Sequence, residues 1–324
     1  MKILITGGLG FIGSHLSYEL DKNHNITIMD NFDLNYPGYA KIFRGPNQGV
    51  TRISKLEEYH REINVKYRFE LIKKTKASIH RQWSFENISY NNPILYDLII
   101  NCGGLSEAIL SNYFSEFCFD SIVKGTENIK TIYSCPILHL SSSMVYGSWE
   151  GKITEDYLRK PVDKYGFNKL YSEEFCTEND VILRPIHVYG IGDSKFPIWM
   201  NIERQIEKAK PVNVEAADCI YIDDFVEIVK NIIANWVPGT YNISSNLIRD
   251  GQVLQKIYPK DFVVNNKLGP TGKPRGALDS SKLFDTFGVR LKYNTYEETI
   301  RDYYGKYENL RSQQWHKQSL SHFK

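Results

Sequence analysis

ITGGLGFIG, residues 5–13, connects a short apolar run at residues 2–6 to a segment with helical spacing at residues 11–20. Its glycines recur at every third position. In a strand-to-helix turn, the first permits a tight reversal, the second lets a pyrophosphate approach the backbone, and the third lets the helix pack closely on the strand. The opening N–H groups of the helix then point at the phosphates. The residues predicted to contact a dinucleotide here are Gly7, Gly10, Phe11, Ile12 and Gly13.

A second short apolar run, residues 26–30, ends at Asp30. A carboxylate at the end of the second strand accepts hydrogen bonds from both ribose hydroxyls and repels a 2′-phosphate. Asp30, followed by Asn31, therefore predicts NAD rather than NADP as the cofactor. The alternative is that Asp30 only caps the next turn.

Further apolar runs alternate with helical segments along the first half of the chain, at residues 96–102, 135–141 and 180–185. This order predicts an α/β fold with a Rossmann-type doubly wound parallel sheet, covered on both faces. After Pro185, glycines and prolines divide the chain into shorter pieces, which predicts a smaller, partly interleaved C-terminal α/β lobe. The expected division is an NAD-binding domain over residues 1–185 and about 213–245, and a substrate-binding lobe over about 186–212 and 246–324.

Three local patterns make sharper predictions. Residues 66–72 (KYRFELI) suggest a strand after a long polar loop over residues 31–65. Residues 162–178 predict a helix. Residues 223–236 predict another, with Asp223 as its acidic N-cap.

Tyr165 and Lys169 lie one turn apart on the predicted helix and share a face. A phenol has a pKa of about 10, so a phenolate near neutral pH requires a drop of about three units, worth roughly 4 kcal/mol. A nearby ammonium and an oxidised nicotinamide both favour the anion. Tyr165 is thus the predicted general base. Without the upstream glycine turn, a surface Tyr and Lys would be the ordinary interpretation.

A serine cluster follows the strand that ends near residue 141. At the carboxyl end of a parallel strand, Ser142 can hydrogen-bond the same substrate oxygen as Tyr165.

Composition excludes several classes of function. Forty Lys and Arg balance thirty-eight Asp and Glu, and the net charge of +2 argues against nucleic acid and membrane surfaces as partners. No apolar run is long enough to span a bilayer, and no leader precedes the first predicted strand. The five cysteines are odd in number and lack Cys-x-x-Cys pairs, which predicts reduced thiols in a cytoplasmic protein.

The chain resembles the extended short-chain dehydrogenase/reductases, especially their nucleotide-sugar epimerases and dehydratases. The resemblance rests on TGGLGFIGSH (6–15), MDN (29–31), SSSMVYG (141–147), YGFNK (165–169), LRPIHVYG (183–190) and YIDDFV (221–226). It implies Ser142 as the catalytic hydroxyl, Tyr165 as the base and Lys169 as a ligand of the nicotinamide ribose. It also implies cofactor contacts from Cys102, Gly103, Gly104 and Pro185, and a homodimer formed through helices of the first domain.

Departures from the family pattern narrow the reaction. Dehydratases place Asp-Glu after the catalytic hydroxyl, where this chain has Ser143 and Met144. Met144 cannot transfer a proton, so the chain lacks the acid or base that a dehydratase has there. The reaction that the remaining residues can catalyse is oxidation and reduction at one carbon. The predicted function is therefore an NAD-dependent epimerase of a nucleotide-diphosphate sugar, acting at C4. A ketoreductase or dehydrogenase, a 4,6-dehydratase with unusual proton carriers, and a non-catalytic nucleotide sensor are the alternatives.

Substrate recognition also departs from the pattern. His187 stands where epimerases have Asn, and Ala217 stands where they have an arginine for the diphosphate. The sequence candidates for substrate contacts are Ser142, Ser143, Met144, His187, Arg204 and Arg275. His187 has a structural interpretation as well. No second ligand at a suitable spacing supports a metal site, so none is predicted.

Overall fold

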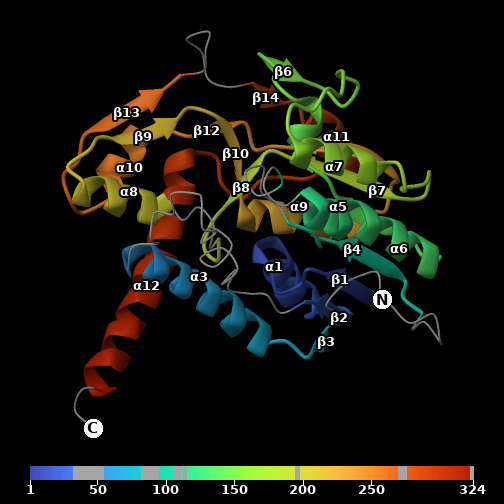
Figure 1. The fold of residues 1–324 in the computed structure, drawn as a ribbon, viewed down its shortest axis with the longest axis horizontal. Coiled ribbons are helices and arrows are strands. Elements are labelled where there is room, and N and C mark those ends of the chain that lie inside the picture. Colours follow the sequence, from blue (N-terminus) through green and yellow to red (C-terminus); the bar gives the residue numbers. More distant parts are fainter. Residues whose placement is uncertain are drawn as a thin grey trace.

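The computed structural model describes residues 1–31, 55–81, 95–105, 111, 115–193, 198–268 and 276–321. Within these residues, seven strands form one parallel sheet in the order β11-β7-β5-β4-β1-β2-β3. Figure 1 labels β7, β4, β1, β2 and β3 of this sheet, and helices lie on both sides of it. The strands are β1 (Lys2–Thr6), β2 (Asn25–Asp30), β3 (Ser78–Arg81), β4 (Leu98–Asn101), β5 (Ile137–Leu140), β7 (Val181–Pro185) and β11 (Gly239–Ile243). The predicted Rossmann-type fold is confirmed.

The strand order reverses at β1, which pairs with β2 on one side and β4 on the other. The chain winds from β1 out to β3, then returns through β4, β5 and β7 to β11. Loops leaving β1 and β4 therefore turn to opposite faces of the sheet. In open α/β sheets, ligands bind outside the carboxyl ends of the strands at such a reversal.

Apolar residues on both faces of the strands explain why helices cover both sides. Ile3 and Ile5 of β1 belong to the core cluster that includes α1 (Phe11–Leu20) and α9 (Ile222–Ala234). Leu4 belongs instead to the cluster that includes Ile129 of α6 (Gly125–Ile132). Successive side chains of a strand point to opposite faces, so β1 has a helix layer on each.

A π-helical turn at Asp120–Lys124 joins α5 (Ser115–Phe119) to α6, and α7 (Lys164–Glu173) packs against α5 and this turn. The remaining helices are α3 (Lys55–Lys73), α8 (Ile198–Glu207), α10 (Gly251–Ile257), α11 (Ser281–Phe287) and α12 (Tyr296–Ser321), and a 3-10 helix spans Ser143–Tyr146.

The other described strands form three small sheets, in the orders β12-β10-β8, β13-β9 and β14-β6. Their strands are β6 (Lys152–Ile153), β8 (His187–Tyr189), β9 (Val212–Glu215), β10 (Asp218–Tyr221), β12 (Leu247–Ile248), β13 (Val264–Lys267) and β14 (Ala277–Leu278).

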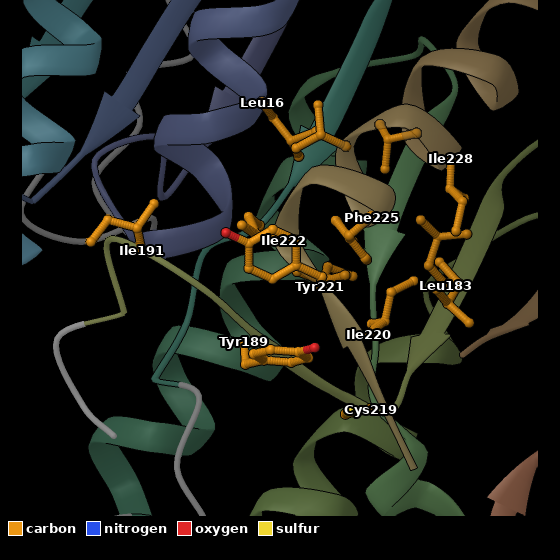
Figure 2. Packing of buried hydrophobic residues seen from close by; sticks show 14 of the residues in the cluster. Leu16, Leu183, Tyr189, Ile191, Cys219, Ile220, Tyr221, Ile222, Phe225 and Ile228 are labelled. Atoms are coloured by element: carbon orange, nitrogen blue, oxygen red, sulfur yellow. The ribbon is translucent and has the colours of Figure 1, made fainter. Parts of the chain in front are cut away.

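The main sheet and the β12-β10-β8 sheet share one core (Figure 2). Leu183 of β7, Leu16 of α1 and Phe225 of α9 belong to the same buried cluster as Tyr189 and Tyr221. The Tyr189 and Tyr221 rings lie 5.4 Å apart between centroids. Dense packing of this kind holds β8 and β10 in a fixed position relative to the main sheet.

The prediction of a strand at residues 66–72 is wrong, because these residues belong to α3. Buried side chains recur at helical spacing, at Ile63, Leu71 and Ile72, whereas Phe69 is exposed. The helical period over the whole of α3 outweighs the short alternation within it.

The predicted N-cap at Asp223 is also wrong. Helix α9 begins at Ile222, after Tyr221, and has no side-chain cap. The Asp223 carboxylate instead accepts a 2.9 Å hydrogen bond from Lys306 Nζ of α12. The helix predicted at residues 162–178 is shorter, since α7 ends at Glu173. Among the described helices, none combines the length and apolar character needed to cross a bilayer.

Candidate active site

The glycine turn between β1 and α1 has no room for side chains. Gly7 adopts a φ of +64°, and a Cβ there would lie 2.8 Å from Cys102 O. A Cβ on Gly13 would lie 2.2 Å from Gly7 O, so only glycine lets α1 start this close to the strand. Helix α1 begins after Gly10 without a side-chain cap. The predicted cradle for a pyrophosphate therefore has the backbone geometry that NAD requires.

Asp30 lies half-buried at the end of β2 and is tied to this turn. Its Oδ2 accepts a 2.9 Å hydrogen bond from the Leu9 N–H, and Asn31 follows it, also half-buried. The carboxylate is thus next to the glycine turn, where the ribose of a dinucleotide would lie.

Cys102, Gly103 and Gly104 follow β4 beside the glycine turn. The Gly103 N–H donates to Thr6 Oγ1 at 3.2 Å, which ties this loop to β1. A Cβ on Gly104 would lie 2.8 Å from Ile122 Cγ1 of the π-helical turn. Burial raises the pKa of the Cys102 thiol to about 12, so this thiol stays protonated and unreactive.

A chain of buried polar groups, not found from the sequence, links this loop to α7. Asn101 accepts a 2.8 Å hydrogen bond from Thr6 and lies 3.3 Å from His139 Nδ1. His139 Nε2 lies 2.9 Å from Ser172 Oγ, which itself donates to Lys169 O at 2.8 Å. Burial lowers the pKa of His139 well below its usual value, so the imidazole is neutral. The cofactor loop and α7 are thereby held together.

Ser142 leaves β5 in extended conformation and caps the 3-10 helix. Its Oγ accepts a 3.2 Å hydrogen bond from the Met144 N–H. The same side chain interacts with Tyr165, and this interaction acts to lower the pKa of the Tyr165 phenol. Ser143 is buried and Met144 half-buried in the same turn. The structure therefore brings Ser142 and Tyr165 together at the end of β5.

Helix α7 presents Tyr165 and Lys169 to the end of β5. Its N-cap is Asp163, whose carboxylate accepts a 2.8 Å hydrogen bond from the Gly166 N–H. Lys169 is buried, and its Nζ donates to Leu140 O at 2.6 Å. This ammonium lies 6.0 Å from the centroid of the Tyr165 ring.

The Tyr165 pKa differs from the expectation of a lowered value. Burial raises it to about 12, and the Ser142 hydrogen bond opposes that rise only in part. Protein encloses the ring on most sides although part of the side chain stays accessible. The lowering predicted from Lys169 is not seen, because its ammonium bonds Leu140 O rather than the phenol. A cationic nicotinamide beside the ring would act in the lowering direction.

The buried carboxylate of Glu173 also holds the site in place, although no local sequence pattern predicts this role. Ser141 Oγ donates to Glu173 Oε1, and Arg184 donates to both oxygens of Glu173 at 3.0 and 2.7 Å. Arg184 also donates to the Tyr146 hydroxyl at 2.9 Å. Glu173 follows Lys169 by one helical turn, a spacing that the sequence does display. Its partners, one directly after β5 and one on β7, become neighbours only in the fold.

The remaining residues that the sequence predicts to contact cofactor or substrate lie on other elements than Ser142 and Tyr165, or outside the described residues. Pro185 ends β7, and His187 opens β8 beside Cys219. The His187 side chain retains exposure, but enclosing protein, followed by the charge of Arg249, lowers its pKa to about 4. Arg204 lies half-buried on α8, which packs on α3 and β9. Arg275 lies outside the described residues.

A glycine turn at the switch point, with Ser142, Tyr165 and Lys169 at the same carboxyl edge, defines a dinucleotide-dependent α/β enzyme. Residues 3–244 match the NAD dependent epimerase/dehydratase family, and the chain belongs to it. Membership confirms NAD as the cofactor.

Two curated relatives match about three quarters of the chain. One, described as an uncharacterized UDP-glucose epimerase from Bacillus subtilis, is 27% identical over 262 residues, covering 75% of this chain and 76% of its own. The other, a GDP-6-deoxy-D-talose 4-dehydrogenase from Aggregatibacter actinomycetemcomitans, is 23% identical over 265 residues, covering 76% and 75%.

Among solved structures, a UDP-glucuronic acid 4-epimerase from Bacillus cereus in complex with NAD superposes with a TM-score of 0.72. It is 21% identical, and the match covers 96% of this chain and 99% of that one. At this identity the likeness establishes the fold alone.

Proposed function

We propose that this chain is a nucleotide-sugar epimerase that inverts C4 of the sugar. The observation that carries the proposal is the pairing of Ser142 with Tyr165 at the carboxyl edge that also bears the glycine turn. The epimerases among its relatives and structural neighbours support the same class of reaction.

Tyr165, as phenolate, takes the proton of the C4 hydroxyl, and Ser142 hydrogen-bonds the same oxygen. Bound NAD supplies a reversible acceptor for the hydride of that carbon. The keto-sugar then turns its other face towards the nicotinamide. The hydride returns to C4 from that side, and Tyr165 returns the proton to the oxygen. Protons and electrons balance over the cycle, so no second substrate is needed.

Met144 supports epimerisation over elimination of water. It follows Ser142 in the 3-10 helix, where its backbone N–H is bound to Ser142 Oγ and its side chain is half-buried. A thioether neither donates nor accepts a proton at neutral pH. Elimination would need another acid and base at this place.

The test is to incubate the purified chain and NAD separately with UDP-glucose, UDP-galactose and UDP-glucuronic acid. NMR identifies the sugars formed, mass spectrometry detects any loss of water, and absorbance follows reduced nicotinamide. Conversion to the C4 epimer at constant mass, without lasting absorbance and abolished in Tyr165→Phe, is expected. Failure to invert any sugar in a wider panel of nucleotide sugars would reject the proposal.

The second candidate is a nucleotide-sugar dehydrogenase or ketoreductase, which the 4-dehydrogenase relative favours. The same groups at Tyr165 and Ser142 would serve it. Sustained, stoichiometric formation of reduced nicotinamide would identify this reaction instead.

The remaining assignments complete the proposal. NAD is held by residues 1–185 with about 213–245, and the sugar nucleotide by about 186–212 and 246–324. Exposed aromatic side chains on α5 and α7 support a homodimer, namely Phe117, Phe119, Phe167 and Tyr171.

A further inference from the structure

Four residues share one face of the small β12-β10-β8 sheet. The Arg249 N–H donates to Ala217 O at 3.0 Å, which continues the antiparallel pairing of β12 with β10. On the other side of β10, His187 of β8 pairs with Cys219. Directly opposed residues point to the same face, and the face repeats at every second residue. The side chains of Arg249, Ala217, Cys219 and His187 therefore share a face.

Among the residues that the structure describes, the Arg249 guanidinium makes one long ion pair. The partner in that pair is Glu215, whose Oε2 lies 3.9 Å from Nη2, beyond hydrogen-bonding distance. Its Nε is buried and has no hydrogen-bond partner in the described part of the chain. The side chain remains 23% exposed. A guanidinium with unused donors next to solvent is suited to a bidentate oxyanion.

This face lies next to the catalytic edge. The Ser141 N–H donates to Leu183 O at 2.8 Å, so Ser142 leaves β5 beside the end of β7. The chain then passes through Pro185 into β8, where His187 begins the small sheet. Because His187 is neutral near pH 7, Arg249 supplies the positive charge on this face.

We propose that Arg249 binds the diphosphate of the nucleotide sugar. The small methyl group of Ala217, opposite Arg249, leaves space for this side chain on the shared face. Arg249 thus provides, from the neighbouring strand, the guanidinium that the resemblance places at residue 217. This inference rests on the proposed function. It assigns diphosphate recognition to Arg249, so neither Arg204 nor Arg275 is required for it.

The test measures binding of UDP, GDP, dTDP and CDP to the NAD-saturated chain by titration calorimetry, together with uridine, UDP-glucose and UDP-glucuronic acid. Variants are Arg249→Met, Arg249→Lys and, as matched control, Arg301→Met. Arg301 is exposed on α12 and paired with Glu297 at 2.6 Å. Arg249→Met should weaken the preferred nucleoside diphosphate by about 10- to 100-fold, as expected for lost charge-assisted hydrogen bonds. Arg249→Lys should lose less, and Arg301→Met should bind as the original chain does.

The outcomes separate this inference from the proposed function. Equal binding of nucleoside diphosphate by Arg249→Met and the original chain overturns the assignment, whatever the activity. Weakening confined to UDP-glucuronic acid overturns it too, by assigning Arg249 to a sugar carboxylate. Weakened diphosphate binding in a chain that inverts no sugar would support Arg249 and reject the epimerase. Binding of none of the diphosphates by the original chain rejects both.

Discussion

Tyr165 illustrates how one residue's chemistry depends on its surroundings. Burial raises the phenol pKa to about 12, while the Ser142 hydrogen bond acts in the opposite direction. A phenolate base works only above its pKa, or when a positive charge stabilises the anion. In the proposed reaction, Ser142 hydrogen-bonds the substrate oxygen and also lowers the pKa of Tyr165.

Ser142→Ala should move the rising limb of kcat/KM against pH to higher pH. Without the hydroxyl, the rise caused by burial is less opposed, so less phenolate forms at any given pH. Loss of one donor to the reacting oxygen should also lower kcat by about 10²- to 10³-fold. The pH profile of epimerisation, compared with Tyr165→Phe as the chain lacking the base, checks this. An unmoved limb would show that Ser142 does not tune the phenol.

Glu173 has a role that the local sequence does not reveal. It is buried, as is Arg184, and it joins α7 to β5 and β7. Removing one partner of such a pair leaves the other charge buried without compensation.

Glu173→Gln should therefore lower the free energy of unfolding by about 3 kcal/mol, within the range for broken buried pairs. Urea denaturation of the purified variant gives the value. The double variant Glu173→Gln with Arg184→Met serves as control and should recover part of the loss, since no unpaired guanidinium remains. No recovery would mean that shape rather than charge dominates.

At the scale of elements, the contact between α7 and the 3-10 helix sets the catalytic geometry. A Cβ on Gly166 would lie 2.5 Å from Met144 O, a backbone atom that cannot easily move away. This glycine therefore allows α7 to approach the turn that carries Ser142. The backbone approach fixes the Ser142–Tyr165 pairing.

Gly166→Ala should separate α7 from this turn and lower kcat at least about tenfold, because small misplacements of catalytic groups are costly. NAD binding should change little. Gly305→Ala is the matched control: a Cβ there meets no atom within 4 Å, and Ala should stabilise α12 by about 0.5–1 kcal/mol. Activity assays measure kcat of both variants, and thermal unfolding measures their stability. Full activity in Gly166→Ala would contradict the proposed role of the contact.

At the scale of the whole molecule, exposed aromatic rings gather on neighbouring helices. Phe117 and Phe119 belong to α5, and Phe167 and Tyr171 to α7, which contacts α5. Aromatic residues are enriched in the centres of protein interfaces. A second copy of the chain is the proposed partner of this surface.

Phe117→Asp should shift the chain from dimer to monomer, because a carboxylate at the centre of an apolar interface loses its hydration. Light scattering coupled to size-exclusion chromatography measures the mass. Val263→Asp, at an exposed position away from α5 and α7, is the control and should leave the mass unchanged. A monomeric original chain would rule out the dimer.

The local sequence determined the features that depend on neighbouring residues. The glycines of residues 5–13 favour a tight strand-to-helix turn, and the short apolar runs of β1, β4, β5 and β7 favour buried strands. Tyr165 and Lys169 share a helix face through spacing alone. These features follow from backbone sterics and periodicity, which act within a few residues.

Tertiary structure decided what depends on contacts between distant parts of the chain. Residues 66–72 became helical because the whole of α3 buries one face, which a short alternation cannot reveal. The pKa of Tyr165 is raised because the ring is buried. Arg249 lies opposite Ala217 because β12 pairs with β10. Burial and register arise only when the sheets assemble, so no single stretch of sequence contains them.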